Sequence, residues 1–158
     1  NKEAVAHAVG VGAVIFHDLK NDRTNNFDFA LEEVVQFEGE TGPYVQYTHA
    51  RAMSILRKAN HTVDTKEAFS LTDDDAWEVL KLIENYPNVV RFAEEKCEPS
   101  AIAKFVINLA QAFNKYYAHT KVLVEDEAFN SRIALVQTTA SILKQGLALL
   151  GVAAPDEM

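Results

Sequence analysis

The sequence is poor in the residues on which disulfide-bonded and membrane-spanning proteins depend. It holds one cysteine, Cys97, among 158 residues, and a single cysteine cannot form an internal disulfide. Its apolar runs are far shorter than the roughly 20 residues that span a bilayer, and no secretory signal pattern is present. These absences predict a cytoplasmic chain that does not contact membranes.

Motifs of catalytic and metal sites are also missing. None of the five histidines lies in an H-E-x-x-H motif or near a C-x-x-C pair, and no glycine-rich loop matches a P-loop. The two glycines at 10 and 12 lack the third glycine of a dinucleotide-binding fingerprint. No nucleophile can be paired with a base and a carboxylate. We therefore expect no catalytic residue, no metal ligand and no bound cofactor in this chain.

Acidic residues are absent from two windows of an otherwise acidic sequence. The net charge is −8 at pH 7, which argues against an extended nucleic-acid-binding face. The windows 41–63 and 99–124, however, hold six Lys or Arg residues, four of the five tyrosines, and no Asp or Glu. They carry +6, and the remainder carries −14. Tyrosine rings and cations without neighbouring carboxylates indicate two segments that face a polyanion.

The segment from Thr41 to Lys58 combines a core stripe with a ladder of tyrosine and basic side chains. At 100° per residue, Val45, Ala52 and Ile55 lie on one side of a helix. The neighbouring side carries, at i, i+3, i+7 and i+14, the residues Tyr44, Tyr47, Arg51 and Lys58. This ladder suits a flat anionic partner, although tyrosines beside a core stripe can equally pack there with their hydroxyls in water.

Helical periodicity extends over most of the remaining chain, and polar breakers divide it. Outside the ladder segment, the first half is expected to form a helix over 2–17, a loop over 18–26, a helix over 27–37 and a linker over 60–70. Thr72 is the expected N-cap of the next helix, with Asp75 as the capping-box acid. Trp77 is expected on the packed face of that helix, and Pro87 is expected to interrupt it before a shorter helix ends near Lys96.

Two long apolar stripes follow in the second half of the chain. One helix opens at Pro99, where a proline suits the first turn. The last helix, roughly 127–150, carries a large apolar residue every three or four positions and stops at Gly151. No segment has the pattern of a strand. The sequence therefore predicts an all-α fold, a bundle of about six helices.

Six strings of this sequence match the pattern of a known family. They are, in chain order, V-G-V-G-A-V-I-F-H-D-L (9–19), N-D-R-T (21–24), F-E-G-E-T-G-P-Y-V-Q-Y-T-H-A-R (37–51), N-K-Y-Y (114–117), R-I-A-L (132–135) and G-L-A-L-L-G-V-A-A-P-D-E-M (146–158). Together they span nearly the whole chain, which resembles the C-terminal third of a bacterial-type arginyl-tRNA synthetase. The resemblance implies the DALR-type anticodon-binding fold of this class I synthetase.

The resemblance also implies a two-part organisation. Residues 37–158 would form the α-helical anticodon-binding domain, and residues 1–36 would be the last piece of the catalytic region. Complete enzymes of this family ligate arginine to its tRNA with ATP and magnesium, in the cytoplasm and usually as monomers. Without the nucleotide-binding fold, this chain is expected to bind the anticodon arm of arginine tRNA, to contact the missing catalytic domain, and not to catalyse alone.

Position by position, the resemblance assigns the tRNA-binding residues Tyr44, Tyr47, Arg51, Asn114, Tyr116, Tyr117 and Met158. Anticodon bases are single-stranded, so aromatic rings can stack on them at roughly 1–3 kcal/mol per base. Tyr116 also belongs to an apolar stripe, so packing in the core is its alternative role. Glu157 stands where the family commonly has a basic residue, which argues against a phosphate contact there. Outside this set, Lys58, Lys104, Lys115 and Lys121 are expected to be ordinary solvated lysines.

A second function stays open at this stage. The heptad-like seam of the last helix suits a helical protein–protein interaction or dimerisation module that has no RNA role. The same seam serves an intramolecular core equally well, so the sequence does not separate the two.

Overall fold

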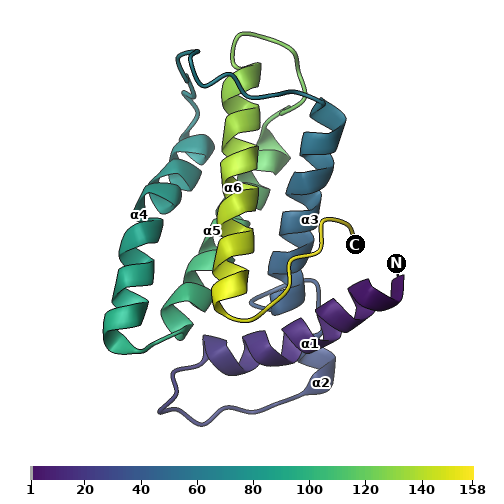
Figure 1. Cartoon of the computed structure of the whole chain (residues 1–158), viewed down its shortest axis with the longest axis vertical. Coiled ribbons are helices and arrows are strands. Elements are labelled where there is room, and N and C mark those ends of the chain that lie inside the picture. The colour runs from purple at the N-terminus through teal and green to yellow at the C-terminus, as the bar shows by residue number, and fades with distance from the viewer. Residues whose placement is uncertain (1) are drawn as a thin grey trace.

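The computed structural model describes residues 2–158, which form helices and no strand (Figure 1). The helices, in chain order, are α1 (Lys2–Lys20), α2 (Leu31–Val34), α3 (Gly42–Ala59), α4 (Asp74–Lys96), α5 (Ser100–His119) and α6 (Phe129–Leu149). The predicted all-α fold with about six helices is confirmed. Within the same range, no helix combines the length and the hydropathy needed to cross a membrane.

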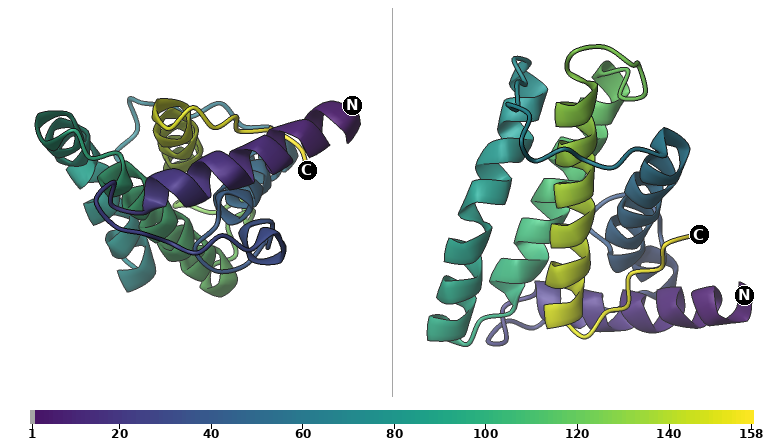
Figure 2. Two further views of the ribbon diagram at one scale, coloured as in Figure 1. Left: turned by 90° about the horizontal axis from the view of Figure 1, so that it is seen from below. Right: turned by 45° about the horizontal axis from the view of Figure 1, so that its top comes forward.

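Four helices, α3 to α6, form a bundle, and α1 lies across one end of it (Figure 1 and Figure 2). The helices α1 and α3 approach closely at two glycines. A Cβ atom on Gly42 would come 2.8 Å from the Cβ of Phe16 and 2.9 Å from the carbonyl oxygen of Gly12. The missing side chains allow this crossing, and Phe16 is fully buried as a result. Helix α1 therefore shares the core of the bundle.

The core is built from the apolar stripes that the periodicity predicts. Helix α5 contributes Leu109 and Phe113, and α6 contributes Ile133, Leu143 and Leu147, all without exposed surface. Each large apolar side chain buried in this way stabilises the fold by roughly 1.5–3 kcal/mol. The heptad-like seam of α6 is thus occupied within the chain.

The expected helix over 27–37 is wrong for most of its length, because only the four residues of α2 are helical there. The rings of Phe27 and Phe29 both meet the ring of His17 edge-on, with centroids 5.2 and 5.7 Å away. Side chains two residues apart share one side of an extended chain but not of a helix. The contact with His17 therefore favours an extended chain at Phe27 and Phe29, although the apolar spacing predicts a helix.

The expected interruption at Pro87 is also wrong, because α4 runs through it without a break. A proline inside a helix removes one hydrogen bond and crowds the preceding turn. Packing on both sides of Pro87 offsets the free energy lost with that hydrogen bond. Tyr86 stacks on Phe105 of α5 with 5.3 Å between ring centroids, and Ala93 is buried in the core.

Trp77 does not pack inside the bundle as expected. Its side chain is 57% exposed, whereas the positions beside it, Ala76 and Val79, are fully buried. With Phe69 and Leu135, Trp77 lines an apolar groove of about 790 Å³ between α4, α6 and the linker before α4. The buried face of α4 is therefore rotated away from the side that the spacing of Trp77 suggested.

The start of α4 differs by one residue from the prediction. Asp73, not Thr72, is the N-cap, and its carboxylate accepts from the N–H of Ala76 at 2.7 Å. The carboxylate of Asp75 is engaged elsewhere, by the His119 ring at 2.6 Å and by the Lys115 ammonium at 3.0 Å. With Asp73 as the N-cap, the N3 position is Ala76, so the predicted capping box does not form.

After α6 the chain turns at Gly151, whose φ of +74° is the left-handed conformation that favours glycine. The predicted helix stop is confirmed. The following residues run back beside α3 (Figure 2). Gln46 of α3 donates from Nε2 to the carbonyl oxygen of Ala153 at 2.7 Å. The tail, residues 152–158, thereby lies next to the helix that carries the tyrosine ladder.

Candidate nucleic-acid interface

The ladder segment forms α3, and the start of this helix sets which side chains face outward. Thr41 is the N-cap and accepts from the N–H of Tyr44 at 3.1 Å, and Pro43 follows in the first turn. Val45 is then fully buried, whereas Tyr47 is 41% exposed. The predicted core stripe is confirmed, and Tyr47 and Lys58 are exposed as the ladder requires. Tyr44 is half-buried and packs against the core, which is the alternative role considered for it.

Arg51 is the centre of the candidate site. Its guanidinium carbon lies 5.0 Å from the ring centroid of Tyr47 and 5.8 Å from that of Tyr117 on α5, within the range of cation–π attraction. It also donates to Asn114 Oδ1 at 2.9 Å. Among residues 2–158, no ion pair involves Arg51. Neutral groups therefore hold its positive charge in place without cancelling it.

Asn114 connects the two helices that build the site. Its Nδ2 donates to the hydroxyl of Tyr44 at 3.0 Å and to Thr48 Oγ1 at 2.9 Å, while its Oδ1 accepts from Arg51. Both hydrogens of the amide are thus used inside the protein. Asn114 orients Arg51 and Tyr44, and it has no donor left over for a base.

Tyr116 does not belong to this surface, and its assignment as a tRNA-binding residue is wrong. Its side chain is fully buried on α5, and its hydroxyl has no hydrogen-bond partner among the described residues. Burial raises the pKa of this hydroxyl to about 12. The apolar stripe of α5 turns Tyr116 inward, so the alternative role of core packing holds.

Tyr117 and Met158 do reach the exposed surface, at 37% and 41% exposure. Met158 lines a shallow pocket of about 370 Å³ together with Tyr47 and Arg51. The two acid-free helices and the end of the tail therefore meet on one open face. Residues far apart in the sequence are brought together as the resemblance implies.

Four further residues surround the site without having been singled out from the sequence. Ala50, Ser54 and Arg57 line the pocket, and Phe37 meets the ring of Tyr47 edge-on with 6.2 Å between centroids. The three on α3 follow Tyr47 at i+3, i+7 and i+10, so extending the ladder's own spacing would have found them. Phe37 lies before a breaker, and no periodicity signals its contact.

Both positive and negative side chains line the edge of the pocket beside Tyr47 and Arg51. Arg57 lies 3.5 Å from the carboxylate of Glu157, which partly neutralises it. Lys115 pairs with Asp75 on α4 instead of facing the pocket. The three remaining lysines of the acid-free windows are exposed and form no ion pair within residues 2–158: Lys58, Lys104 and Lys121.

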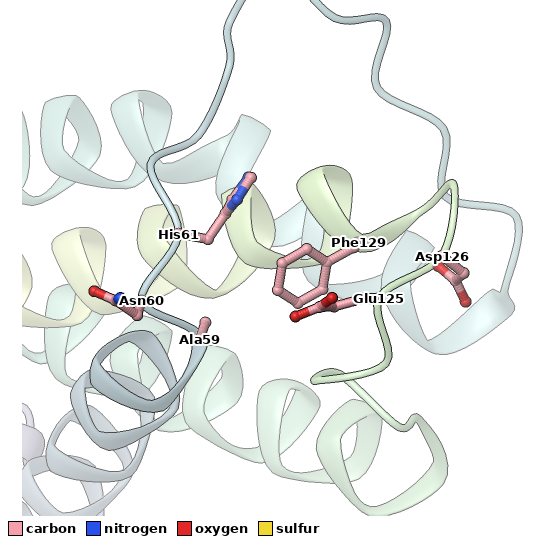
Figure 3. Close-up of a pocket in the computed structure, with 6 residues that line it drawn as sticks. All are labelled: Ala59, Asn60, His61, Glu125, Asp126 and Phe129. Atoms are coloured by element: carbon pink, nitrogen blue, oxygen red, sulfur yellow. The ribbon is translucent and has the colours of Figure 1, made fainter.

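A second, polar pocket of about 330 Å³ lies at the other end of α3 (Figure 3). The rings of His61 and Phe129, which both line it, meet edge-on with 5.0 Å between centroids, and Glu125 lies beside Phe129. It holds no tyrosine or arginine. In the described part of the chain, no group of three His, Cys, Asp or Glu side chains could hold a metal ion.

Comparison with known proteins identifies related chains. The DALR anticodon binding domain family matches residues 45–158. The chain is 65% identical over 158 residues to an arginine–tRNA ligase of Enterococcus faecalis and 58% identical to one of Streptococcus thermophilus. Each match covers the whole of this chain and 28% of the relative. The chain therefore spans little more than a quarter of the length of these relatives.

Solved structures show the same arrangement of helices. The arginyl-tRNA synthetase of Thermus thermophilus superposes with a TM-score of 0.92 at 36% identity, over the whole of this chain and 28% of that protein. The enzyme of Plasmodium falciparum superposes with a TM-score of 0.90 at 26% identity, over 98% of this chain and 28% of that protein. On the helical fold and the match over residues 45–158, the chain belongs to the family of DALR anticodon-binding domains found in arginyl-tRNA synthetases.

Proposed function

We propose that this chain is the tRNA-binding part of an arginine–tRNA ligase and that it binds the anticodon arm of arginine tRNA. The observation that carries the proposal is Arg51 held between the rings of Tyr47 and Tyr117 on an open face, without an ion-pair partner among the described residues. The similarity of the whole chain to arginine–tRNA ligases supports the choice of tRNA.

The chemistry of the face suits an anticodon loop. Loop bases are unstacked and can be splayed out onto aromatic rings, and stacking contributes roughly 1–3 kcal/mol per base. Tyr47 and Tyr117 offer such rings, and Arg51 offers donors to a base edge or a phosphate. Because Asn114 already holds Arg51 in place, little side-chain freedom is lost when the RNA binds.

The whole ligase would supply the parts that this face lacks. We propose that the complete protein joins arginine to its tRNA in the cytoplasm as a monomer, and that ATP and magnesium bind in its catalytic part. The residues described here offer no cluster of metal ligands, so no chemical step is assigned to them. The chain alone would bind tRNA without charging it.

The test is a titration of this chain with an RNA stem-loop carrying an arginine anticodon, at low salt. We expect Tyr47→Ala to weaken binding by about tenfold, the effect of losing one stacked base. The matched control is Lys104→Ala on α5, which removes an exposed charge away from the pocket. That control should change the affinity by no more than about twofold.

A second stem-loop, altered only at the second anticodon base, tests recognition. The wild-type chain should bind it several-fold more weakly, because a misplaced base edge leaves donors of Arg51 unpaired. Equal affinity for the two stem-loops would remove the claim that the face reads the anticodon. Equal losses in Tyr47→Ala and Lys104→Ala would leave only non-specific phosphate binding.

The alternative of a dimerisation module loses its main support. The side chains of the α6 seam are buried in the chain's own core, Val136 and Leu143 completely. Sedimentation over micromolar concentrations distinguishes the two functions. A stable dimer that excludes the stem-loop would favour the interaction module over the RNA-binding domain.

A further inference from the structure

Two buried polar side chains of α3 face the tail instead of solvent. Gln46 is fully buried, and its Nε2 donates both to the carbonyl oxygen of Ala8 at 3.1 Å and to that of Ala153 at 2.7 Å. His49, one turn further along α3, is 1% exposed, and its Nδ1 lies 3.0 Å from the carbonyl oxygen of Pro155. Helix α3 thus binds the backbone of the tail at two points.

The hydrogen bond to Pro155 determines the state of the His49 ring. A carbonyl oxygen only accepts, so Nδ1 carries the hydrogen and the neutral ring leaves Nε2 without one. Burial lowers the pKa of His49, while the Pro155 contact and the charge of Asp156 oppose that change. Nε2 has no hydrogen-bond partner and faces the Asp156 carboxylate at 4.0 Å. The tail is the only partner of this buried imidazole among the described residues.

The residues after Pro155 are held by exposed charges. Asp156 lies 3.6 Å from the ammonium of Lys144, and its carbonyl oxygen accepts from Arg57 at 3.1 Å. Exposed ion pairs contribute little stability, with a median of about 0–1 kcal/mol. Gln46 and the buried Val152 hold the start of the tail. Beyond them, the buried contact of His49 is the anchor for the last residues, and their path ends with Met158 beside Tyr47 and Arg51.

We propose that His49 is a positioning residue that anchors the tail through Pro155, so that Met158 forms one wall of the pocket beside Tyr47 and Arg51. Its side chain acts through the tail and does not touch the RNA. The part of this inference that concerns RNA rests on the proposed function, whereas the part that concerns the tail stands on the contacts alone.

A histidine kept only for core packing would behave differently. An apolar side chain of similar size would fill the same space without the cost of burying an imidazole. Leu at position 49 should then leave the tail in place. If the hydrogen bond is what matters, only a residue with a donor at the Nδ1 position will keep the tail bound, and the amide of Asn reaches that position.

The experiment compares His49→Leu with His49→Asn, each carrying ¹³C-methyl methionine for NMR. The chain has two methionines. Met158 reports on the tail, and Met53, which is packed against the core from α3, reports on folding. We expect His49→Leu to move the Met158 signal to the shift of a disordered methionine while Met53 stays dispersed. His49→Asn should restore the wild-type Met158 signal.

An unchanged Met158 signal in His49→Leu, with the chain folded, would overturn the proposal. Failure of His49→Asn to restore the signal lost in His49→Leu would also overturn it, because the hydrogen bond would then not be the anchor. Neither NMR measurement needs RNA. Their outcome is therefore independent of the proposed function, which fails if the wild-type chain does not bind the stem-loop.

Binding of the arginine-anticodon stem-loop tests the wall of the pocket. We expect His49→Leu to weaken it by about tenfold, the effect of losing one well-packed contact, and His49→Asn to restore it. Removing residues 156–158 deletes the wall without altering the core, and it should give the same loss even if His49→Leu fails to fold. Wild-type affinity in the shortened chain would overturn the role of Met158.

Discussion

Tyr116 and Tyr117 are neighbours in the sequence with opposite environments. One ring is fully buried and the other is 37% exposed over Arg51. A helix turns by 100° per residue, so the two side chains point in directions about 100° apart. The difference between the two tyrosines makes Tyr116 a sensitive probe of the core and Tyr117 a probe of the surface.

Replacing Tyr116 by Phe should keep or raise stability at neutral pH. The lost hydroxyl is buried without a partner, and relieving such a group contributes about 1 kcal/mol. Urea unfolding followed by circular dichroism at pH 7 measures the change. Binding of the stem-loop should stay at the wild-type level. A loss of affinity as large as that of Tyr117→Ala would mean that Tyr116 reaches the RNA.

The same variant should change the response to alkaline pH. Burial raises the pKa of the Tyr116 hydroxyl to about 12 from 10.0. Between these pH values the unfolded chain loses the proton first, so the free energy of unfolding falls as the pH rises, by up to about 3 kcal/mol. Tyr116→Phe should lose less stability between pH 9 and 11 than the wild type does.

Among the elements, α4 shows how tertiary contacts shift a helix start. The sequence predicts Thr72 as the N-cap, but Asp73, the next residue, is of a type that caps equally well. Burial of Ala76 and Val79 in the core sets the rotation of α4 about its axis, and Asp75 then pairs with His119 and Lys115 on α5. With that rotation, the carboxylate that reaches the N–H of Ala76 belongs to Asp73.

Two matched substitutions test this N-cap. Asp73→Ala should lower the free energy of unfolding by about 1 kcal/mol, the usual effect of removing a side-chain cap. Thr72→Ala should change it by less than about 0.5 kcal/mol, as for an exposed side chain without a structural contact. Both values come from urea unfolding at pH 7. Equal losses in the two variants would contradict the assignment of the cap.

At the scale of the whole molecule, exposed apolar side chains gather in the N-terminal part of the chain. α1 and the segment after it expose large side chains that would be buried in a self-sufficient core: Val11, Val14, Phe27, Phe29, Leu31 and Val35. Exposed apolar patches of this kind mark contact surfaces or cause association. These exposed side chains are in line with the prediction that residues 1–36 are the last piece of the catalytic region, which stays a prediction.

Replacing Val14 and Leu31 together by Lys should raise the highest concentration at which the chain is still monomeric. Both side chains are about half exposed, so the free energy of unfolding should change little. Sedimentation velocity over a concentration series measures the effect. Leu123→Lys, in the loop between α5 and α6, is the control. A change as large in the control would assign the effect to added charge alone.

The sequence by itself determined the class of fold and most of the ladder. Apolar spacing in α3, α5 and α6 marks the core correctly, because a helix of known pitch assigns each residue to a face. The acid-free windows and the family strings pointed to Tyr44, Tyr47 and Arg51, and the structure gathers these residues on or beside one face. These features are local, so they can be read before any partner helix is known.

Only the tertiary structure decided what depends on contacts between distant residues. In the folded chain Tyr116 is buried, and α4 continues through Pro87 without a break. The chain at Phe27 and Phe29 is extended, and both rings contact His17. It also brought the tail to α3, through hydrogen bonds that join residues about a hundred positions apart. Periodicity says which side of an element is apolar, but the rotation of one element against another follows from packing, and packing appears only when the whole chain is folded.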